Sequence, residues 1–401
     1  MQKKNPILRL FILTSFYFMI ANFAHPVEPT YYKMLNLPDY MFGLAFAAMA
    51  TTTFMFSPFW GKMADRFGPV RTASICFIGY GIGQAYFFFL SDGVADIVLA
   101  RLLAGVFIGG LGVSHILYII ENMEGEHKGG PLATYATLQA VFSAFGYLVG
   151  GIVGDLSLTG CLAAEVLGLF ALSFLYRIFL QDKPRDKAKT DMRELFKEAN
   201  PLKAFVIPKE DVTIAFISFL LVCMFTSFAA TCYEQCFNYF IKDQYGFPPS
   251  YNGYLKGGVG IITLIANSTI CTYLLNKTEI RKSITYILAA CMFMMIGIIM
   301  IDEVRPFIIL NVVFFGFNAV YKPLLQAMLN GFSKKSSGSI VGLYNSISSI
   351  GTIVGSLTSG FVYAVSPKGS FRYSAIAFAL AIICSIIQRK NDVQLKESEN
   401  V

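Results

Sequence analysis

Charged residues are scarce in this chain of 401 residues. Asp, Glu, Lys and Arg make up 14% of it, whereas a soluble domain has about 25%. Hydrophobic residues make up 55%, and the mean hydropathy is +0.58. Apolar runs of about 20 residues, the length that crosses a bilayer, recur along the whole chain. This composition excludes a soluble domain with a single anchor and predicts an all-α membrane protein.

Signatures of enzymatic chemistry and of metal binding are also missing. The chain has three His and eight Cys, without a CxxC pair, and the cysteines are scattered through apolar runs as packing residues. HExxH, P-loop and GxSxG motifs are absent. We expect no enzyme, no metal and no cofactor. A membrane-embedded enzyme, a receptor or a scaffold stays as the alternative class, which a measurement of saturable flux would separate from transport.

Twelve apolar segments are predicted to be membrane-spanning helices. A polar stretch, 182–210, divides them into two six-helix halves, 1–181 and 211–389, and a tail, 390–401, follows. The first segment lacks a cleavage site and is expected to remain as a helix. The expected spans are 7–30, 41–60, 70–91, 94–121, 130–154, 160–181, 211–237, 250–275, 282–301, 304–332, 338–364 and 370–389.

The distribution of Lys and Arg predicts the orientation. With the N-terminus inside, 24 of the 32 basic residues lie in inner segments and 5 in outer segments, while Arg101, Lys256 and Lys322 lie within spans. Cytoplasmic loops carry such an excess of basic residues. We therefore expect both termini in the cytoplasm. The same excess explains the net charge of +7 without nucleic acid as a partner.

The two halves contain an internal repeat. Ser143, Gly146, Val149 and Gly150 recur as Ser348, Gly351, Val354 and Gly355, at a constant offset of 205 residues. Small residues at helical spacing let two helix backbones approach closely. Duplicated halves are typical of transporters that rock around a site at the middle of the membrane.

The segment 61–71, GKMADRFGPVR, resembles the signature loop of the major facilitator superfamily, roughly G-x-L-A-D-R-x-G-R-[RK]. The matching residues are Gly61, Ala64, Asp65, Arg66 and Gly68. The family's trailing basic pair is replaced by Pro-Val, and Arg71 follows directly. The resemblance implies a major facilitator fold, with twelve transmembrane helices in two pseudo-symmetric halves of six.

Three further matches resemble drug:proton antiporters within that superfamily. Arg101 precedes Gly105 by four residues, as the family's membrane Arg does. The glycines from Gly146 to Gly154 resemble its G-x3-G-P-x2-G-G pattern, although Gly replaces the Pro and Asp155 the last Gly. The segment 26–31, PVEPTY, resembles its P-x-x-P-x-Y end of the first helix.

The loop motif predicts a gate at the cytoplasmic face. Asp65 is expected to meet a helix N-terminus, whose dipole favours an anion, and Arg66 to pair with Glu121. A simple basic turn is the alternative interpretation. The expected gating residues are Gly61, Asp65, Arg66, Gly68, Arg71, Glu121, Gly146 and Gly150.

Ionisable groups inside spans are functional candidates, because they are expensive in hydrocarbon. Glu28 shares a helix face with His25, and a carboxyl group removed from water can exchange a proton near neutral pH. Glu234 holds a similar position in the second half, where Lys256 could neutralise it. The expected proton-coupling residues are Glu28, Glu234, His25 and Arg101. A solvated outer loop is the alternative for the first pair, Glu165 is expected to be interfacial, and His115 could be a packing residue.

Aromatic and polar residues on the expected spans are candidates for the substrate site. Aromatic rings with a few charges suit amphipathic or cationic aromatic molecules. The expected substrate-binding residues are Tyr31, Tyr32, Gln139, Phe142, Tyr233, Phe237, Lys256, Asn318, Tyr321, Lys322, Gln326, Tyr344 and Asn345.

Together these features predict a secondary transporter that works by alternating access. An acid in each half favours proton-coupled efflux of drug-like molecules, and a carrier for a specific metabolite or lipid-like substrate is the alternative. We expect a monomer in the bacterial cytoplasmic membrane, with a small molecule, protons and lipid as its partners.

Overall fold

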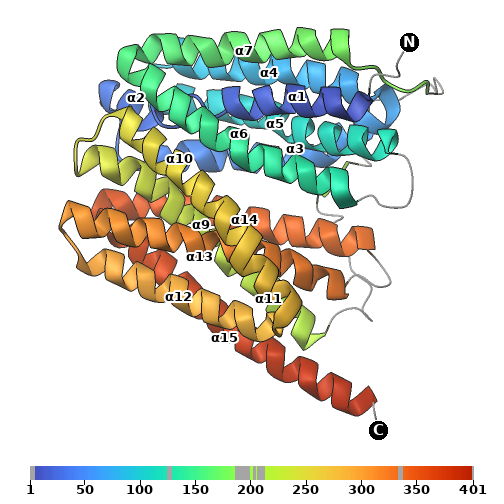
Figure 1. Cartoon of the computed structure of the whole chain (residues 1–401). Coiled ribbons are helices and arrows are strands. Elements are labelled where there is room, and N and C mark those ends of the chain that lie inside the picture. Colours follow the sequence, from blue (N-terminus) through green and yellow to red (C-terminus); the bar gives the residue numbers. More distant parts are fainter. Residues whose placement is uncertain are drawn as a thin grey trace. The chain divides into compact units, whose positions relative to one another are not determined.

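The computed structural model describes residues 5–123, 129–185, 199–201, 205, 213–332 and 337–399. The expected linker, 182–210, lies mostly outside these residues. Within them, the regular secondary structure is entirely helical (Figure 1). The helices are α1 (Pro6–Ile20), α2 (Glu28–Met34), α3 (Met41–Phe67), α4 (Pro69–Phe89), α5 (Val94–Asn122), α6 (Gly129–Leu156), α7 (Leu158–Phe179), α9 (Ile214–Asp243), α10 (Pro249–Ala266), η3 (Asn267–Cys271), α11 (Thr272–Lys277), α12 (Ile280–Met300), α13 (Val304–Phe332), α14 (Ser337–Val365) and α15 (Gly369–Glu399).

The membrane-spanning helices agree with the sequence analysis except at the first span. Eleven described helices are long and apolar enough to cross a membrane, counting α10, η3 and α11 as one. The expected continuous helix over 7–30 is wrong, because α1 ends at Ile20 and α2 begins only at Glu28. Pro26 has no N–H to donate to Asn22 and disfavours a helix through this point. We call residues 21–27 the helix-1 break.

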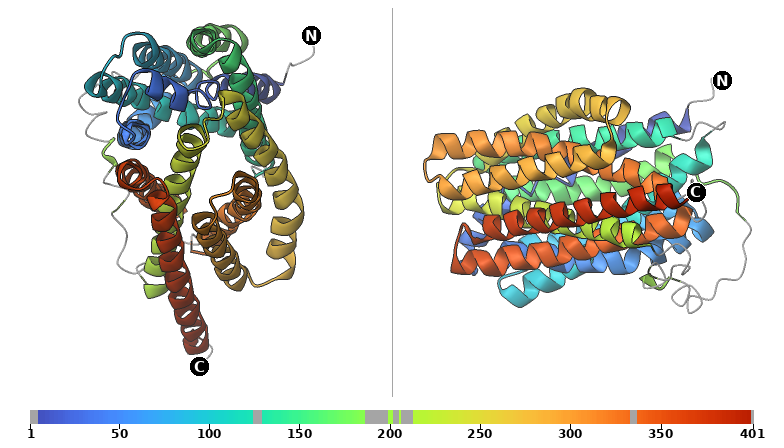
Figure 2. Two further views of the ribbon diagram at one scale, coloured as in Figure 1. Left: turned by 90° about the vertical axis from the view of Figure 1, so that its left-hand side faces the viewer. Right: turned by 90° about the horizontal axis from the view of Figure 1, so that it is seen from below.

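The chain forms two compact units. The first unit contains 1–37, 48–201 and 246–258, and the second contains 38–47, 202–245 and 259–401. In the first unit α4 packs against α5 and α7, and α1 packs against α6. In the second unit α9 packs against both α14 and α15, and α12 packs against α15. Figure 2 shows that α15 continues beyond the ends of its neighbours in this unit.

The internal repeat is a structural repeat. A Cβ atom on Gly146 or Gly150 would collide with the carbonyl oxygens of Met19 and Phe23 in the first unit. The glycines 205 residues later, Gly351 and Gly355, face the carbonyl oxygens of Met224 and Phe228, which are also 205 residues later. Each unit therefore has a pair of glycines, at equivalent positions, that lets the backbone of its first transmembrane segment pack closely.

Candidate functional site

The first unit buries an ion pair between the start of α2 and α5. Glu28 begins α2, and its Oε1 lies 2.5 Å from Nη2 of Arg101, whose side chain is 3% exposed. The guanidinium carbon also lies 3.8 Å from the centre of the Phe87 ring on α4. A charge-assisted hydrogen bond and an aromatic face are the two contacts that best hold a desolvated guanidinium. Arg101 is thus fixed among three elements of this unit.

A second carboxyl group lies deeper in the same cluster. Glu165 on α7 has no exposed surface, so the expectation that it is interfacial is wrong. Its Oε1 accepts a hydrogen bond from Nε2 of Gln84 at 2.5 Å, and its Oε2 accepts one from the Ala24 N–H at 2.9 Å. Gln84 Oε1 in turn accepts from Arg101 at 3.2 Å. No local pattern predicts this link, since the packing of α4 between α5 and α7 brings Gln84 and Glu165 together.

His25 connects the cluster to α6 and α10. Its Nδ1 lies 3.4 Å from Glu28 Oε1, and its ring stacks on Tyr147 with centroids 5.5 Å apart. Nζ of Lys256 lies 5.6 Å from the centre of the same Tyr147 ring. His25, Glu28, Gln84, Arg101 and Glu165 are referred to below as the charged cluster.

Two tyrosines and a second described histidine, His115, pack in the same unit. The Tyr31 hydroxyl donates to the Phe87 carbonyl at 2.9 Å, and Tyr32 is buried. His115 lies between the hydroxyls of Tyr135 and Tyr176, at 3.1 and 3.0 Å. Its ring nitrogens therefore have partners inside the protein, which supports the packing interpretation.

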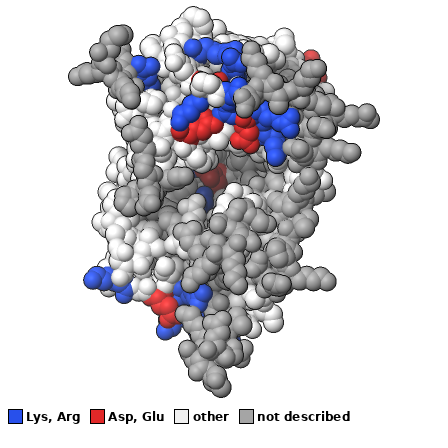
Figure 3. All heavy atoms as spheres, turned by 90° about the vertical axis from the view of Figure 1, so that its right-hand side faces the viewer, with Lys and Arg blue, Asp and Glu red and all other residues white. Residues whose placement is uncertain are grey.

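Charged side chains gather over the ends of the first-unit helices that carry the loop motif (Figure 3). Asp182, which follows α7, accepts hydrogen bonds from the N–H groups of Val70 and Arg71 at 2.7 and 3.1 Å. Gly68 adopts φ +102°, and a Cβ there would strike the Asp182 carboxylate. The conformation and the close approach both require glycine at this turn. The acid at the N-terminus of α4 is therefore Asp182, which sequence reasoning missed.

The same region joins three further elements. Arg185 pairs with Glu121 at the end of α5, and it donates to the carbonyl oxygens of Ala64 and Asp65 in the loop motif. Lys183 donates to the Glu121 carbonyl. Arg66 is half-buried, and its expected pairing with Glu121 stays a prediction, as do the roles of Asp65 and Gly61.

The core of the second unit places aromatic rings where the first unit places charges. Tyr233 stands 205 residues after Glu28 and is 1% exposed. Its hydroxyl donates to Asn311 Oδ1 at 2.6 Å, and its ring centre lies 4.3 Å from that of Phe314. Phe237 and Tyr321 are buried in the same core. Glu234 is half-buried on the next position of α9, so it points to a different side of the helix from Tyr233.

An uncharged polar pair and a lysine form a stripe along α13. Asn318, Lys322 and Gln326 follow one another at intervals of four residues, which places them on one helix face. Lys322 and Gln326 are exposed, and Asn318 is half-buried. In the described part of the chain no acidic side chain pairs with Lys322. A lone ammonium on a membrane-spanning helix is costly in lipid, so this face requires water or a ligand.

The other expected substrate residues lie on α6 and α14. Gln139 and Asn345 are exposed, and Phe142 and Tyr344 are half-buried. Tyr344 stacks against Phe219 with ring centres 6.4 Å apart. These four side chains, together with the α13 stripe, are the expected residues that remain accessible within their units.

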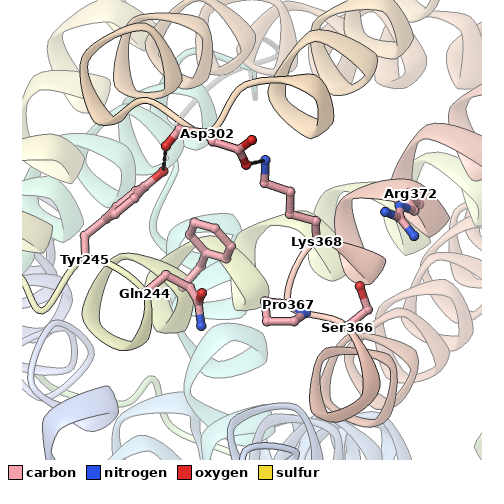
Figure 4. A pocket seen from close by; sticks show the side chains of 8 residues that line it. Gln244, Tyr245, Asp302, Ser366, Pro367, Lys368 and Arg372 are labelled. Atoms are coloured by element: carbon pink, nitrogen blue, oxygen red, sulfur yellow. Dashed lines mark hydrogen bonds and ion pairs between the residues drawn. The ribbon is translucent and has the colours of Figure 1, made fainter.

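A small polar pocket lies at one end of the second unit, between the ends of α9, α12 and α15 (Figure 4). Lys368 lines the pocket, and its ammonium group donates to the Ile301 carbonyl and to Asp302 Oδ1, both at 2.6 Å. Burial, with Asp302 nearby, raises the pKa of the Tyr245 phenol. Because Lys368 is committed to these acceptors, its contacts tie the α12–α13 turn to the start of α15.

These features define a helical membrane protein built from two related units, one of which buries ionisable groups between its helices. A family model described as Major Facilitator Superfamily matches residues 10–320. Quinolone resistance protein NorA of Staphylococcus aureus (strain COL) is 22% identical over 93% of this chain and 93% of its own. Multidrug resistance protein 1 of Bacillus subtilis (strain 168) is 22% identical over 96% of this chain and 97% of its own.

Solved structures share the fold at low identity. An inward-facing bacterial homologue of the human lysosomal transporter Spinster has a TM-score of 0.74 at 14% identity, covering 96% of this chain and 97% of that one. The nucleoside transporter NupG has a TM-score of 0.67 at 15% identity, covering 96% and 99%. The chain belongs to the Major Facilitator Superfamily. It is a multi-pass transporter of the bacterial plasma membrane and not an enzyme.

Proposed function

We propose that this transporter exports drug-like or amphipathic small molecules in exchange for protons. The observation that carries the proposal is the charged cluster, where a Glu–Arg pair and a second acid are buried inside a membrane unit. Ionisable groups at such depth are expensive and mark ion or proton pathways. The names of the relatives, which describe resistance to quinolones and to several drugs, favour export of drug-like compounds.

In this proposal the transporter works by alternating access and consists of two six-helix halves, 1–181 and 211–389, with both termini in the cytoplasm and a monomer as the working form. Accessible aromatic and polar groups on α6, α13 and α14 bind the substrate. Residues 61–71, Glu121 and the α7 exit form the inner gate, where the Asp182 and Arg185 contacts hold these helix ends of the first unit together.

The test uses proteoliposomes with an internal pH dye and an imposed proton gradient. We expect lipophilic drugs to drive proton movement with the wild-type protein, and Glu28→Gln or Glu234→Gln to reduce it at least tenfold. Asp96→Asn is the matched control, since the Asp96 carboxylate lies near a helix end and accepts a hydrogen bond from the Tyr86 hydroxyl at 3.2 Å. A labelled metabolite that crosses saturably while no drug moves protons would contradict the proposal and favour a dedicated carrier.

A further inference from the structure

The charged cluster contains one more acid than fixed cation, and only one of its acids has a cation beside it. Glu28 is matched by Arg101 at 2.5 Å. Glu165 receives its hydrogen bonds from the Gln84 amide and the Ala24 N–H, which carry no net charge. A fully buried carboxylate with neutral donors alone is costly, and binding a proton removes that cost.

We propose that Glu165 is the carboxyl group that takes up and releases a proton during transport, and that this exchange acts on the helix-1 break. The inference rests on the proposed proton coupling and deepens it. The charge balance supports it, because Glu28 and Arg101 cancel. One proton then makes the cluster neutral, and His25 is the other member that titrates near neutral pH.

The other titratable groups around Glu165 do not change the net charge of the cluster near neutral pH. Tyr17 on α1, Tyr80 on α4 and Cys161 on α7 lie close enough to act on Glu165 electrostatically. Tyr147 on α6 contacts His25, and Tyr32 lies beside Arg101. Phenols and thiols are uncharged near neutral pH. The balance is therefore decided among Glu28, Arg101, His25 and Glu165.

The hydrogen bonds of Glu165 explain how a proton would change the conformation. The Ala24 N–H lies inside the helix-1 break and donates to Oε2 at 2.9 Å. A carboxylate is a much stronger acceptor than a neutral acid. Protonation adds an O–H bond at the carboxyl group and breaks no other covalent bond, but it weakens the hold on Ala24 and on Gln84. Because Gln84 also contacts Arg101, protonation of Glu165 affects both the contact with Ala24 and the contact that Gln84 makes with Arg101.

The second unit provides the comparison within the same molecule. Ala229 stands 205 residues after Ala24, and there the neighbouring helix contributes Ser374, whose hydroxyl donates to the Ala229 carbonyl at 2.8 Å. Helix α9 runs unbroken through this point, from Ile214 to Asp243. The broken segment is thus hydrogen-bonded to an acid, Glu165, whereas the continuous helix is hydrogen-bonded to a neutral hydroxyl, that of Ser374.

The first experiment measures protonation without transport. A hydrophobic carbodiimide, which reacts with protonated carboxyl groups in apolar sites, is applied to the purified wild-type protein across a pH series, and modified peptides are identified by mass spectrometry. We expect labelling of Glu165 that falls as the pH rises, with Glu28 unlabelled. Labelling confined to Glu28, or labelling of Glu165 that does not change with pH, would overturn the proposal whether or not drugs are transported.

The second experiment separates coupling from transport. We expect Glu165→Gln to lose substrate-driven proton release at least tenfold while gradient-free exchange of labelled substrate continues with a flattened pH profile. Asp96→Asn should behave as the wild type does in both assays. Retention of coupled proton release with the wild-type pH profile in Glu165→Gln would overturn the assignment. If that variant fails to fold, Glu165→Asp and the wild-type labelling decide.

Discussion

The two units share a framework and differ in what they bury inside it. In both units the backbone of the first transmembrane segment packs closely against a pair of glycines at equivalent positions. The first unit then breaks that helix and gathers His25, Glu28, Arg101 and Glu165 around the break. The second keeps α9 continuous and surrounds Tyr233 with rings. The units share the close approach of two helix backbones, and they differ in the charge that they bury.

The two halves thus share the close contact between helices but not the chemistry of the groups buried at their centre. A buried charge can respond to a proton, whereas a packed aromatic core responds to neither pH nor potential. We infer that the buried charges of the first unit take part in the coupling, whereas the aromatic core around Tyr233 in the second unit does not. Making one unit resemble the other is the direct way to examine this inference.

The largest effect is expected from removing the cation of the charged cluster. Arg101→Met leaves Glu28 buried without its fixed cation, which should cost about 3–5 kcal/mol and lower the yield and melting temperature of the purified protein. The double variant Arg101→Met with Glu28→Gln removes both members of the ion pair, and should regain most of that stability while proton coupling stays lost. A double variant no more stable than the single one would show that the pair is not the source of the loss.

A smaller loss of stability, equal in the two units, is expected from adding a methyl group at the glycine contact that both units share. Gly150→Ala and Gly355→Ala each place a methyl group against a backbone carbonyl, of Phe23 and of Phe228. Overpacking of this kind costs about 1–3 kcal/mol. Gly112→Ala is the control, since nothing lies within 4 Å of its Cβ position. Thermal unfolding in detergent should show two comparable losses and no loss in the control; a loss at only one glycine would contradict the shared framework.

A loss of about 1–2 kcal/mol is expected from the neutral core of the second unit. Tyr233→Phe removes the donor to Asn311 Oδ1, and a buried group that loses its partner costs about that much. Because no charge is involved, the pH dependence of transport should keep its wild-type form. A shifted pH profile in Tyr233→Phe would show that the aromatic core of the second unit also takes part in coupling, and would remove the contrast between the two cores.

The sequence predicted most of the fold and little of the site's geometry. Apolar length located the spans, and the glycine repeat at offset 205 gave the register that the structure confirms. The break after Ile20 was missed because the run stays apolar, although Pro26 and Pro29 marked it. Glu165 was misplaced because its position was judged from distance along one helix, whereas its buried partners lie in the helix-1 break and α4. Partners brought together by packing leave no local signal.

The smallest effects are expected where each unit places an acid near the start of a helix. Asp182 is 13% exposed and accepts two backbone N–H groups at the start of α4, so Asp182→Asn should cost about 1 kcal/mol. In the second unit Glu279, just before α12, is half exposed and pairs with Lys282 at 2.9 Å, and Glu279→Gln should change stability very little.

The effect of Glu279→Gln on stability should depend on pH. The hydrogen bond from Lys282 lowers the pKa of Glu279. Whatever the pair contributes is therefore present above the unfolded-state pKa and is lost as the pH falls through the lower, folded-state pKa. Thermal unfolding from neutral to acidic pH should show Glu279→Gln converging on the wild type at the acidic end. A loss larger than that of Asp182→Asn at neutral pH would mean that the exposed pair, and not the buried cap, secures its helix end.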